Sequence, residues 1–134
     1  MVDAAFYWVH RAMHDIPVLR PLHARHHALL AKHTVWGGLD EDFGEMLAIF
    51  LYINCAFFVL PVTPEYITWF LAGGALQTAF MHGTRAGGWL FPPWPFVGAL
   101  VHHEHHVTIT RNFGGVLVFW DKLMGTEKRK QAAD

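Results

Sequence analysis

Histidine is the residue type with the clearest chemistry in this chain, because a neutral imidazole nitrogen is the commonest metal ligand in proteins. The 134 residues include eleven histidines. Residues three and four apart lie on one face of a helix, so histidines at that spacing direct their rings to one side. Eight of the histidines stand in three clusters with this spacing: His10 and His14; His23, His26 and His27; and His102, His105 and His106. The pattern predicts three ligand-bearing helices and a metal site.

The second and third clusters share the pattern His-x-x-His-His. At about 100° per residue, its three histidines fall on one side of a helix, whereas Arg25 and Glu104 fall on the other. His103 lies off this ligand face and is interpreted as an outer or surface group, and His33 as a surface residue. Eight or nine nitrogens exceed the four ligands of a structural zinc, so the count indicates two metals, or one metal with further histidines around it. Imidazole suits zinc, copper, iron and nickel alike.

Prolines limit the helices that must carry these ligands. A first helix is expected from about Asp3 to His14, ending before Pro17. A second is expected to begin at Pro21 and to fade near Lys32, and a third to run from Phe96 to about Val107. The glycines and prolines between residues 83 and 95 predict an irregular loop that shapes a substrate entry.

Two apolar runs, Met46–Val62 and Tyr66–Met81, contain no charged residue. Each is somewhat short against the roughly 20 residues that span a bilayer, so a buried hairpin in a soluble protein is the alternative. Two adjacent runs favour an integral-membrane helical hairpin. Four acidic residues come just before the first run: Asp40, Glu41, Asp42 and Glu45. Negative charge there complements a helix N-terminus.

The basic residues orient this hairpin. Neither lysine nor arginine occurs between Lys32 and Arg85, whereas both flanks are basic. The positive-inside rule therefore places the hairpin tip, Pro61–Glu65, away from the cytoplasm and both His-x-x-His-His clusters on the cytoplasmic side. His82 follows the second run directly and would emerge on that same side, which makes it a ninth candidate ligand.

Length and composition set further bounds. The chain is 53% hydrophobic and 15% aromatic, and its length suits a single all-α domain over residues 1–134. Its one cysteine excludes a disulfide framework, and its net charge of −1 gives no sign of nucleic-acid binding. Residues Met1–Val9 are apolar apart from Asp3 and have the pattern of the C-terminal part of a helix. We therefore expect an upstream membrane span to be missing from this chain.

Several supporting residues have two interpretations each. Asp3 and Asp121 either hold a ligand imidazole by its second nitrogen or cap a helix. Arg11 either pairs with such a carboxylate or simply marks a cytoplasmic boundary. Asn112 is expected in a turn, with a ligand role as the alternative.

Taken with their order, these motifs resemble the fatty acid hydroxylase and sterol desaturase superfamily of membrane di-iron oxygenases. The resemblance extends from Asp3 to Thr126. It rests on these motifs: Asp3-x-x-x-Tyr7-Trp8-x-His10-Arg11-x-x-His14; His23-x-x-His26-His27; His82-Gly83; His102-x-x-His105-His106; Asn112-Phe113-Gly114; and Trp120-Asp121-x-Leu123-x-Gly125-Thr126. The region Gly38–Glu45 departs from the pattern that often follows the second motif in the family.

The resemblance implies two iron ions, with zinc as an alternative in the isolated protein, and O2 as co-substrate. The ions would be held by His10, His14, His23, His26, His27, His82, His102, His105 and His106. The reaction would hydroxylate or desaturate a C–H bond of a lipid of the sterol or fatty acyl class. No nicotinamide or flavin motif is present, so electrons would come from cytochrome b5 or ferredoxin with a reductase.

Three alternatives stay open at this stage. A carotenoid-type hydroxylase shares the His-x-x-His-His motifs. A membrane cytochrome would need axial histidines inside the bilayer, and the two apolar runs contain none. A non-catalytic metal-binding protein or a truncated relative would bind zinc or no metal. The sequence does not specify the lipid, the carbon attacked or the oligomeric state.

Overall fold

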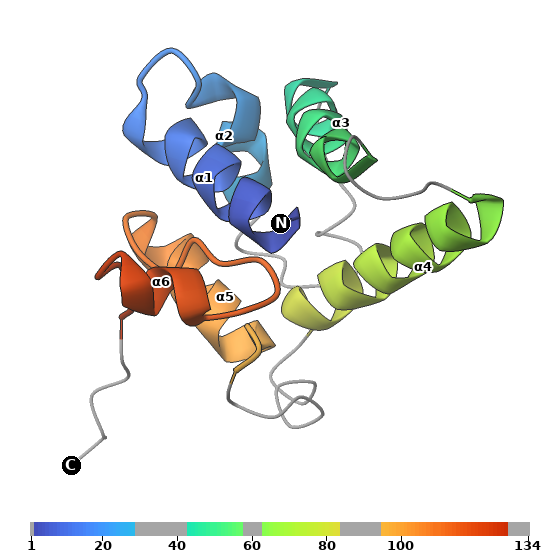
Figure 1. Cartoon of the computed structure of the whole chain (residues 1–134). Coiled ribbons are helices and arrows are strands. Elements are labelled where there is room, and N and C mark those ends of the chain that lie inside the picture. Colours follow the sequence, from blue (N-terminus) through green and yellow to red (C-terminus); the bar gives the residue numbers. More distant parts are fainter. Residues whose placement is uncertain (1, 29–42, 58–62, 84–94, 129–134) are drawn as a thin grey trace.

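The computed structural model describes residues 2–28, 43–57, 63–83 and 95–128. In these ranges the secondary structure is helical apart from one isolated bridge between Phe96 and Leu117, so the prediction of an all-α fold is confirmed. The helices are α1 (Val2–Asp15), α2 (Pro21–Ala28), α3 (Phe43–Phe57), α4 (Pro64–Met81), α5 (Ala99–Thr108) and α6 (Phe119–Leu123) (Figure 1).

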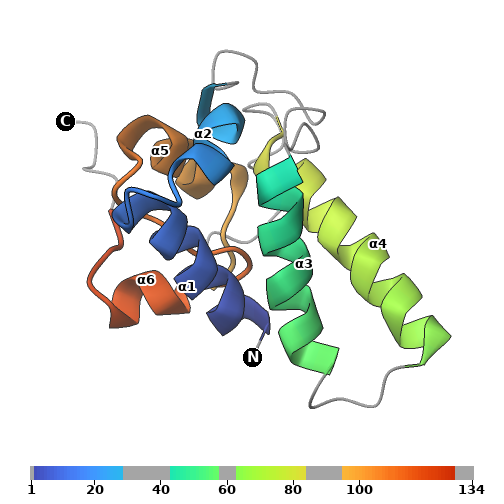
Figure 2. The same ribbon diagram turned by 90° about the horizontal axis from the view of Figure 1, so that it is seen from above.

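Helix α1 is central to the packing, since it contacts both α2 and α3, while α4 contacts α5. Figure 2 shows that α3 begins and α4 ends near α2, and that the two helices diverge away from that end. The short helices that carry histidine clusters therefore gather at one end of the pair α3 and α4.

Local chemistry explains where α4 and α5 begin. The Thr63 side chain accepts a hydrogen bond from the Tyr66 backbone N–H at 3.2 Å, and Pro64 stands at the first helical position. Helix α5 begins at Ala99, three residues later than expected. The delay has a cause: Val97 N donates to Val116 O at 2.8 Å, so this backbone is extended against the closing segment.

The predicted pair of apolar helices appears as α3 and α4. Within the described ranges, no helix is at once long enough and apolar enough to cross a membrane. Both helices leave large apolar side chains exposed: Phe43, Met46, Leu47, Phe50 and Leu51 on α3, and Trp69, Leu71 and Leu76 on α4. Outside the described residues lie His33, the acidic residues 40–42, the end of the first apolar run and the predicted loop from 84 to 94.

A buried carboxylate organises the closing segment after α5. Asp121, which is 1% exposed, accepts hydrogen bonds from the backbone N–H groups of Phe113 and Gly114, both at 2.8 Å, and from the Thr126 hydroxyl at 2.7 Å. A Cβ on Gly114 would lie 2.7 Å from the Leu117 carbonyl oxygen, so glycine is required for this close approach. Thr126 also bonds to the hydroxyl of the buried Tyr7, which connects the segment to α1.

Replacing this carboxylate by an amide tests its structural role. Asp121→Asn would turn an amino group toward an N–H donor, and we expect the free energy of unfolding to fall by about 1–3 kcal/mol. Urea denaturation followed by circular dichroism measures it. The control is Asp15→Asn, because Asp15 is exposed and pairs with Arg11 within one helix at 3.0 Å, an interaction that contributes roughly 0.5 kcal/mol or less. Equal stability of the two variants would contradict the assignment.

Candidate metal centre

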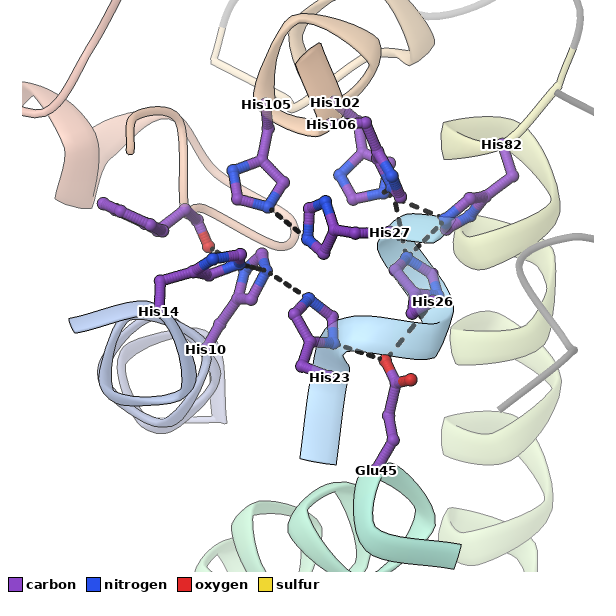
Figure 3. A network of polar contacts seen from close by, with 11 residues as sticks. His10, His14, His23, His26, His27, Glu45, His82, His102, His105 and His106 are labelled. Carbon is purple, nitrogen blue, oxygen red and sulfur yellow. Dashed lines mark hydrogen bonds and ion pairs between the residues drawn. The ribbon is translucent and has the colours of Figure 1, made fainter. Parts of the chain in front are cut away.

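The ends of several helices bring nine histidines together (Figure 3). They come from α1, from α2, from α5 and from His82 at the end of α4. The described structure thus assembles every residue that the sequence analysis proposed as a ligand: His10, His14, His23, His26, His27, His82, His102, His105 and His106. His103 belongs to neither of the clusters that these residues form.

The nine residues form two groups, in each of which the candidate ligand atoms lie within 4.8 Å of one another. The five-histidine group consists of His10, His14, His23, His27 and His105. The four-histidine group consists of His26, His82, His102 and His106. This geometry suits two metal ions better than one ion with outer histidines.

Each His-x-x-His-His motif is divided between the two groups, which sequence spacing alone did not predict. The first and last histidines of a motif, such as His23 and His27, share one group, while the middle one, His26, joins the other. Three rings on one side of a helix therefore need not share one group. The physical reason is angular: residues four apart differ by about 40° around a helix, whereas neighbours differ by about 100°.

All nine rings direct Nε2 into their group. In the five-histidine group, His10 Nε2 lies 3.0 Å from His23 Nε2 and 3.3 Å from His14 Nε2. In the four-histidine group, the Nε2 atoms of His26 and His82 lie 3.1 Å apart, and the other close Nε2–Nε2 separations are 2.9 to 3.1 Å. Nitrogens that bind one ion at about 2.0–2.1 Å lie roughly 2.9–3.4 Å apart from one another in octahedral or tetrahedral shells. The two groups have the dimensions of ligand shells.

The outward nitrogens show that Nε2 carries the lone pair. Backbone carbonyl oxygens lie within hydrogen-bond distance of three of them: Phe113 O is 2.9 Å from His10 Nδ1, Arg111 O is 2.7 Å from His105 Nδ1, and Thr78 O is 2.9 Å from His82 Nδ1. A carbonyl accepts only, so Nδ1 holds the proton in each ring. The inward Nε2 atoms of these three rings are then acceptors, and each faces the Nε2 of a neighbouring histidine. Such an arrangement calls for a cation between them.

Burial keeps these rings neutral. Loss of hydration lowers the pKa of His14 and of His27 to about 4, and the pKa of His26 to about 3. Burial is also the main cause that lowers the pKa of the fully enclosed His10, His102 and His105, with further lowering from neighbouring histidines. A neutral imidazole has the lone pair that a metal needs.

Sequence reasoning missed Glu45, which was grouped with the acidic residues that complement a helix N-terminus. Glu45 is 5% exposed, and its Oε1 accepts a hydrogen bond from His23 Nδ1 at 2.9 Å. The same oxygen lies 3.7 Å from His26 Nδ1. No spacing rule connects residue 45 to the second cluster, because the intervening chain sets where α3 begins.

The other supporting residues act less directly than proposed. Asp3 accepts hydrogen bonds from the backbone N–H groups of Val116 and Leu117 at 2.9 and 3.3 Å, so it fastens α1 to the closing segment. Within the described residues, its hydrogen bonds are to this backbone and not to an imidazole. Arg11 pairs with Asp15 and donates to Tyr7. Asn112 has a positive φ of 59° in its turn, and its side chain accepts from the Lys128 backbone N–H.

A cavity of about 920 Å³ adjoins both groups. Its walls come mainly from apolar residues of α1, α3 and α4, with Phe96 and residues 115–117 at its edge. His10 and His23 of the five-histidine group line it, as do His26, His82 and His102 of the four-histidine group. An apolar molecule in this cavity would touch both candidate metal sites.

The fold and site define an α-helical protein with two adjoining histidine groups beside an apolar cavity. Comparison with known families identifies the class: the sequence model for fatty acid hydroxylases matches residues 1–126. The chain belongs to this family.

Among curated relatives, the putative Delta(7)-sterol-C5(6)-desaturase 2 of Arabidopsis thaliana is 30% identical in an alignment of 131 positions, and the match covers 94% of this chain and 45% of the relative. The alkylglycerol monooxygenase of Homo sapiens is 27% identical over 93% of this chain and 28% of its own length. The fatty acid hydroxylase vlmA of a Lecanicillium species is 27% identical, over 94% of this chain and 39% of its own length. The chain thus spans about half the length, or less, of these relatives. No solved structure gives a significant match.

The lowered histidine pKa values predict how acid affects the metal-free chain. The unfolded chain takes up protons below about pH 6.5, whereas folded His14 and His27 stay neutral until about pH 4. The unfolded state therefore binds more protons in this window, and stability falls as the pH falls from 6.5 to 4. Thermal unfolding of metal-free protein at several pH values measures it. A melting temperature that is constant or rises on acidification would contradict burial of neutral rings.

Proposed function

We propose that this chain supplies the di-iron centre of an O2-dependent enzyme that hydroxylates or desaturates a lipid of the sterol or fatty acyl class. The observation that carries the proposal is the apolar cavity, because histidines of both groups line it. Membership of the fatty acid hydroxylase family supports the reaction type. Relatives named as sterol desaturases and as a monooxygenase of alkylglycerols support a lipid substrate.

In this proposal all nine histidines hold iron, five at one ion and four at the other. Bound iron would supply the redox chemistry that uses O2 to oxidise an unactivated C–H bond. Hydrogen bonds at Nδ1 fix the rings of His10, His23 and His105 in the five-histidine group and of His82 in the four-histidine group, so that Nε2 would point at each ion. The apolar cavity walls would exclude water and hold the hydrocarbon part of the substrate beside the histidines. Electrons would come from an external donor, cytochrome b5 or ferredoxin with its reductase.

We further propose that α3 and α4 are the part of the chain that enters the lipid, with the histidine groups on the cytoplasmic side. Exposed Phe50 on α3 and Trp69 on α4 are 61% and 78% accessible, which suits an apolar surrounding. Neither helix contains a lysine or arginine, and basic residues stand on α1 and α2. The cavity between α1, α3 and α4 would then receive its substrate from the membrane.

The division into two groups predicts the metal content of single variants. His105→Ala removes a ligand of the five-histidine group and His106→Ala one of the four-histidine group, so each variant is expected to keep about one iron where the parent chain holds two. The double variant is expected to lose both. Elemental analysis of protein purified in detergent measures iron and zinc per chain. His103→Ala is the matched control, since His103 lies on the same helix and in neither group. Zinc alone, or no metal in a folded chain, would contradict the di-iron assignment.

A second prediction concerns the substrate. The iron-loaded chain, with reduced ferredoxin and O2, is expected to convert a sterol or fatty acyl lipid to an alcohol or alkene, detected by mass spectrometry. Gly74 lines the cavity, and a Cβ there meets no other heavy atom within 4 Å. Gly74→Leu is therefore expected to fold and to keep its iron while losing roughly tenfold or more in turnover, because it fills substrate space. Unchanged turnover would place the substrate elsewhere, and a loaded chain that oxidises none of the lipids would contradict the function.

A further inference from the structure

Glu45 stands between the two histidine groups. It comes from the first turn of α3, and its side chain is buried against α2 (Figure 3). His23 and His26, which flank it, belong to different groups: His23 to the five-histidine group and His26 to the four-histidine group. One carboxylate therefore faces a ligand of each candidate metal ion.

The distances define what this carboxylate touches. Glu45 Oε1 is 2.9 Å from His23 Nδ1 and 3.7 Å from His26 Nδ1. Both contacts are to the outward nitrogens, while His23 Nε2 and His26 Nε2 point into their own groups. His26 Nδ1 is buried and makes no hydrogen bond within the described part of the chain, and Glu45 Oε1 faces it at 3.7 Å, somewhat beyond hydrogen-bond distance.

Two roles fit a carboxylate beside two imidazoles. The three side chains are close enough to hold a third cation. That role would require each ring to bind metal through both nitrogens and to give up its second proton. As a hydrogen-bond acceptor, Glu45 instead leaves Nδ1 protonated and Nε2 available, the state that the backbone carbonyls impose on His10 and His105.

Charge favours the acceptor role as well. A carboxylate that is 5% exposed loses most of its hydration, and this is costly unless positive charge lies nearby. Two divalent ions, one on the far side of His23 and one on the far side of His26, would provide that charge to a single anion. The same anion makes both imidazoles more basic ligands.

We propose that Glu45 is a positioning residue that couples the two metal sites, because its one carboxylate orients a ligand of each. This inference rests on the proposed function and deepens it. It implies that the two ions do not bind independently: a change at Glu45 weakens both sites, whereas a change at any single histidine removes a ligand from only one.

Cobalt binding to the full chain tests the coupling without requiring activity. Co²⁺ is titrated into metal-free, detergent-purified protein, and absorption of the bound ion gives the number of binding steps and the affinity of each. The parent chain is expected to bind two ions. Glu45→Gln is expected to weaken both steps, by about 10–100-fold each, which is the usual effect of removing such an outer partner. His105→Ala and His106→Ala are each expected to abolish one step.

A matched control separates this effect from loss of charge at a helix end. Glu65 stands in the first turn of α4, as Glu45 does in α3, but is fully exposed. Glu65→Gln is therefore expected to leave both steps unchanged. Glu45→Asp keeps the charge on a shorter side chain and is expected to weaken both steps less than Glu45→Gln. Circular dichroism checks that each variant is helical. If Glu45→Gln does not fold, a Glu45→Asp chain with normal affinity at either step overturns the proposal.

The remaining outcomes are distinct. Weakening of only one step by Glu45→Gln, or of neither, would overturn the coupling while leaving the two-metal proposal intact. Three ions in the parent chain and two in Glu45→Gln would make Glu45 a direct ligand and overturn its positioning role. No Co²⁺ binding by the folded parent chain would overturn the metal centre, and with it both proposals.

Discussion

The structure depends on one electrostatic constraint: nine buried or half-buried imidazoles direct Nε2 toward shared points. In His10, His23, His82 and His105 the hydrogen bond at Nδ1 leaves a lone pair, not a proton, on Nε2. In the five-histidine group, His10 Nε2 lies within 3.3 Å of two other Nε2 atoms, and neutral acceptors at that distance repel one another. Protonation cannot relieve the repulsion, because burial lowers the pKa of these rings. Cations in the two groups would convert this repulsion into coordination, so metal binding would stabilise the arrangement. Packing of α1 and α2 against α3, and of α4 against α5, brings the ligand-bearing ends into register.

Hydrogen bonds at the opposite ring nitrogens connect this constraint to the rest of the fold. The carbonyls of Arg111 and Phe113 fix two rings of the five-histidine group, and those carbonyls are held in place by the turn that Asp121 organises. The closing segment after α5 contributes no ligand within the described residues, yet it sets where ligands point. Its resemblance to the closing motif of the fatty acid hydroxylase family therefore has a physical basis: the motif specifies ring orientation.

How much of this the sequence predicts depends on the range of the interaction. Spacing within one helix pointed to eight of the candidate ligands, and the position after the second apolar run pointed to His82; all nine do come together. The division of a motif between two groups depends on how α2 and α5 face each other, which no local pattern contains. Glu45 was overlooked for the same reason, since its contact with His23 joins residues 22 positions apart. Helix bounds show the same limit: α5 begins late because residues 95–97 pair with a segment about twenty residues further along.

The cavity and the four-histidine group share a structural element, helix α4. Helix α4 supplies cavity wall along much of its length and ends in His82, whose Nδ1 donates to the Thr78 carbonyl one turn earlier. Thr78 itself lines the cavity. Any outward displacement of α4 by an occupant would move the backbone that orients His82, whereas the five-histidine group takes its backbone acceptors from the closing segment. The backbone acceptors of the two groups thus come from different parts of the molecule: α4 supplies the one for His82, and the closing segment supplies those for His10 and His105.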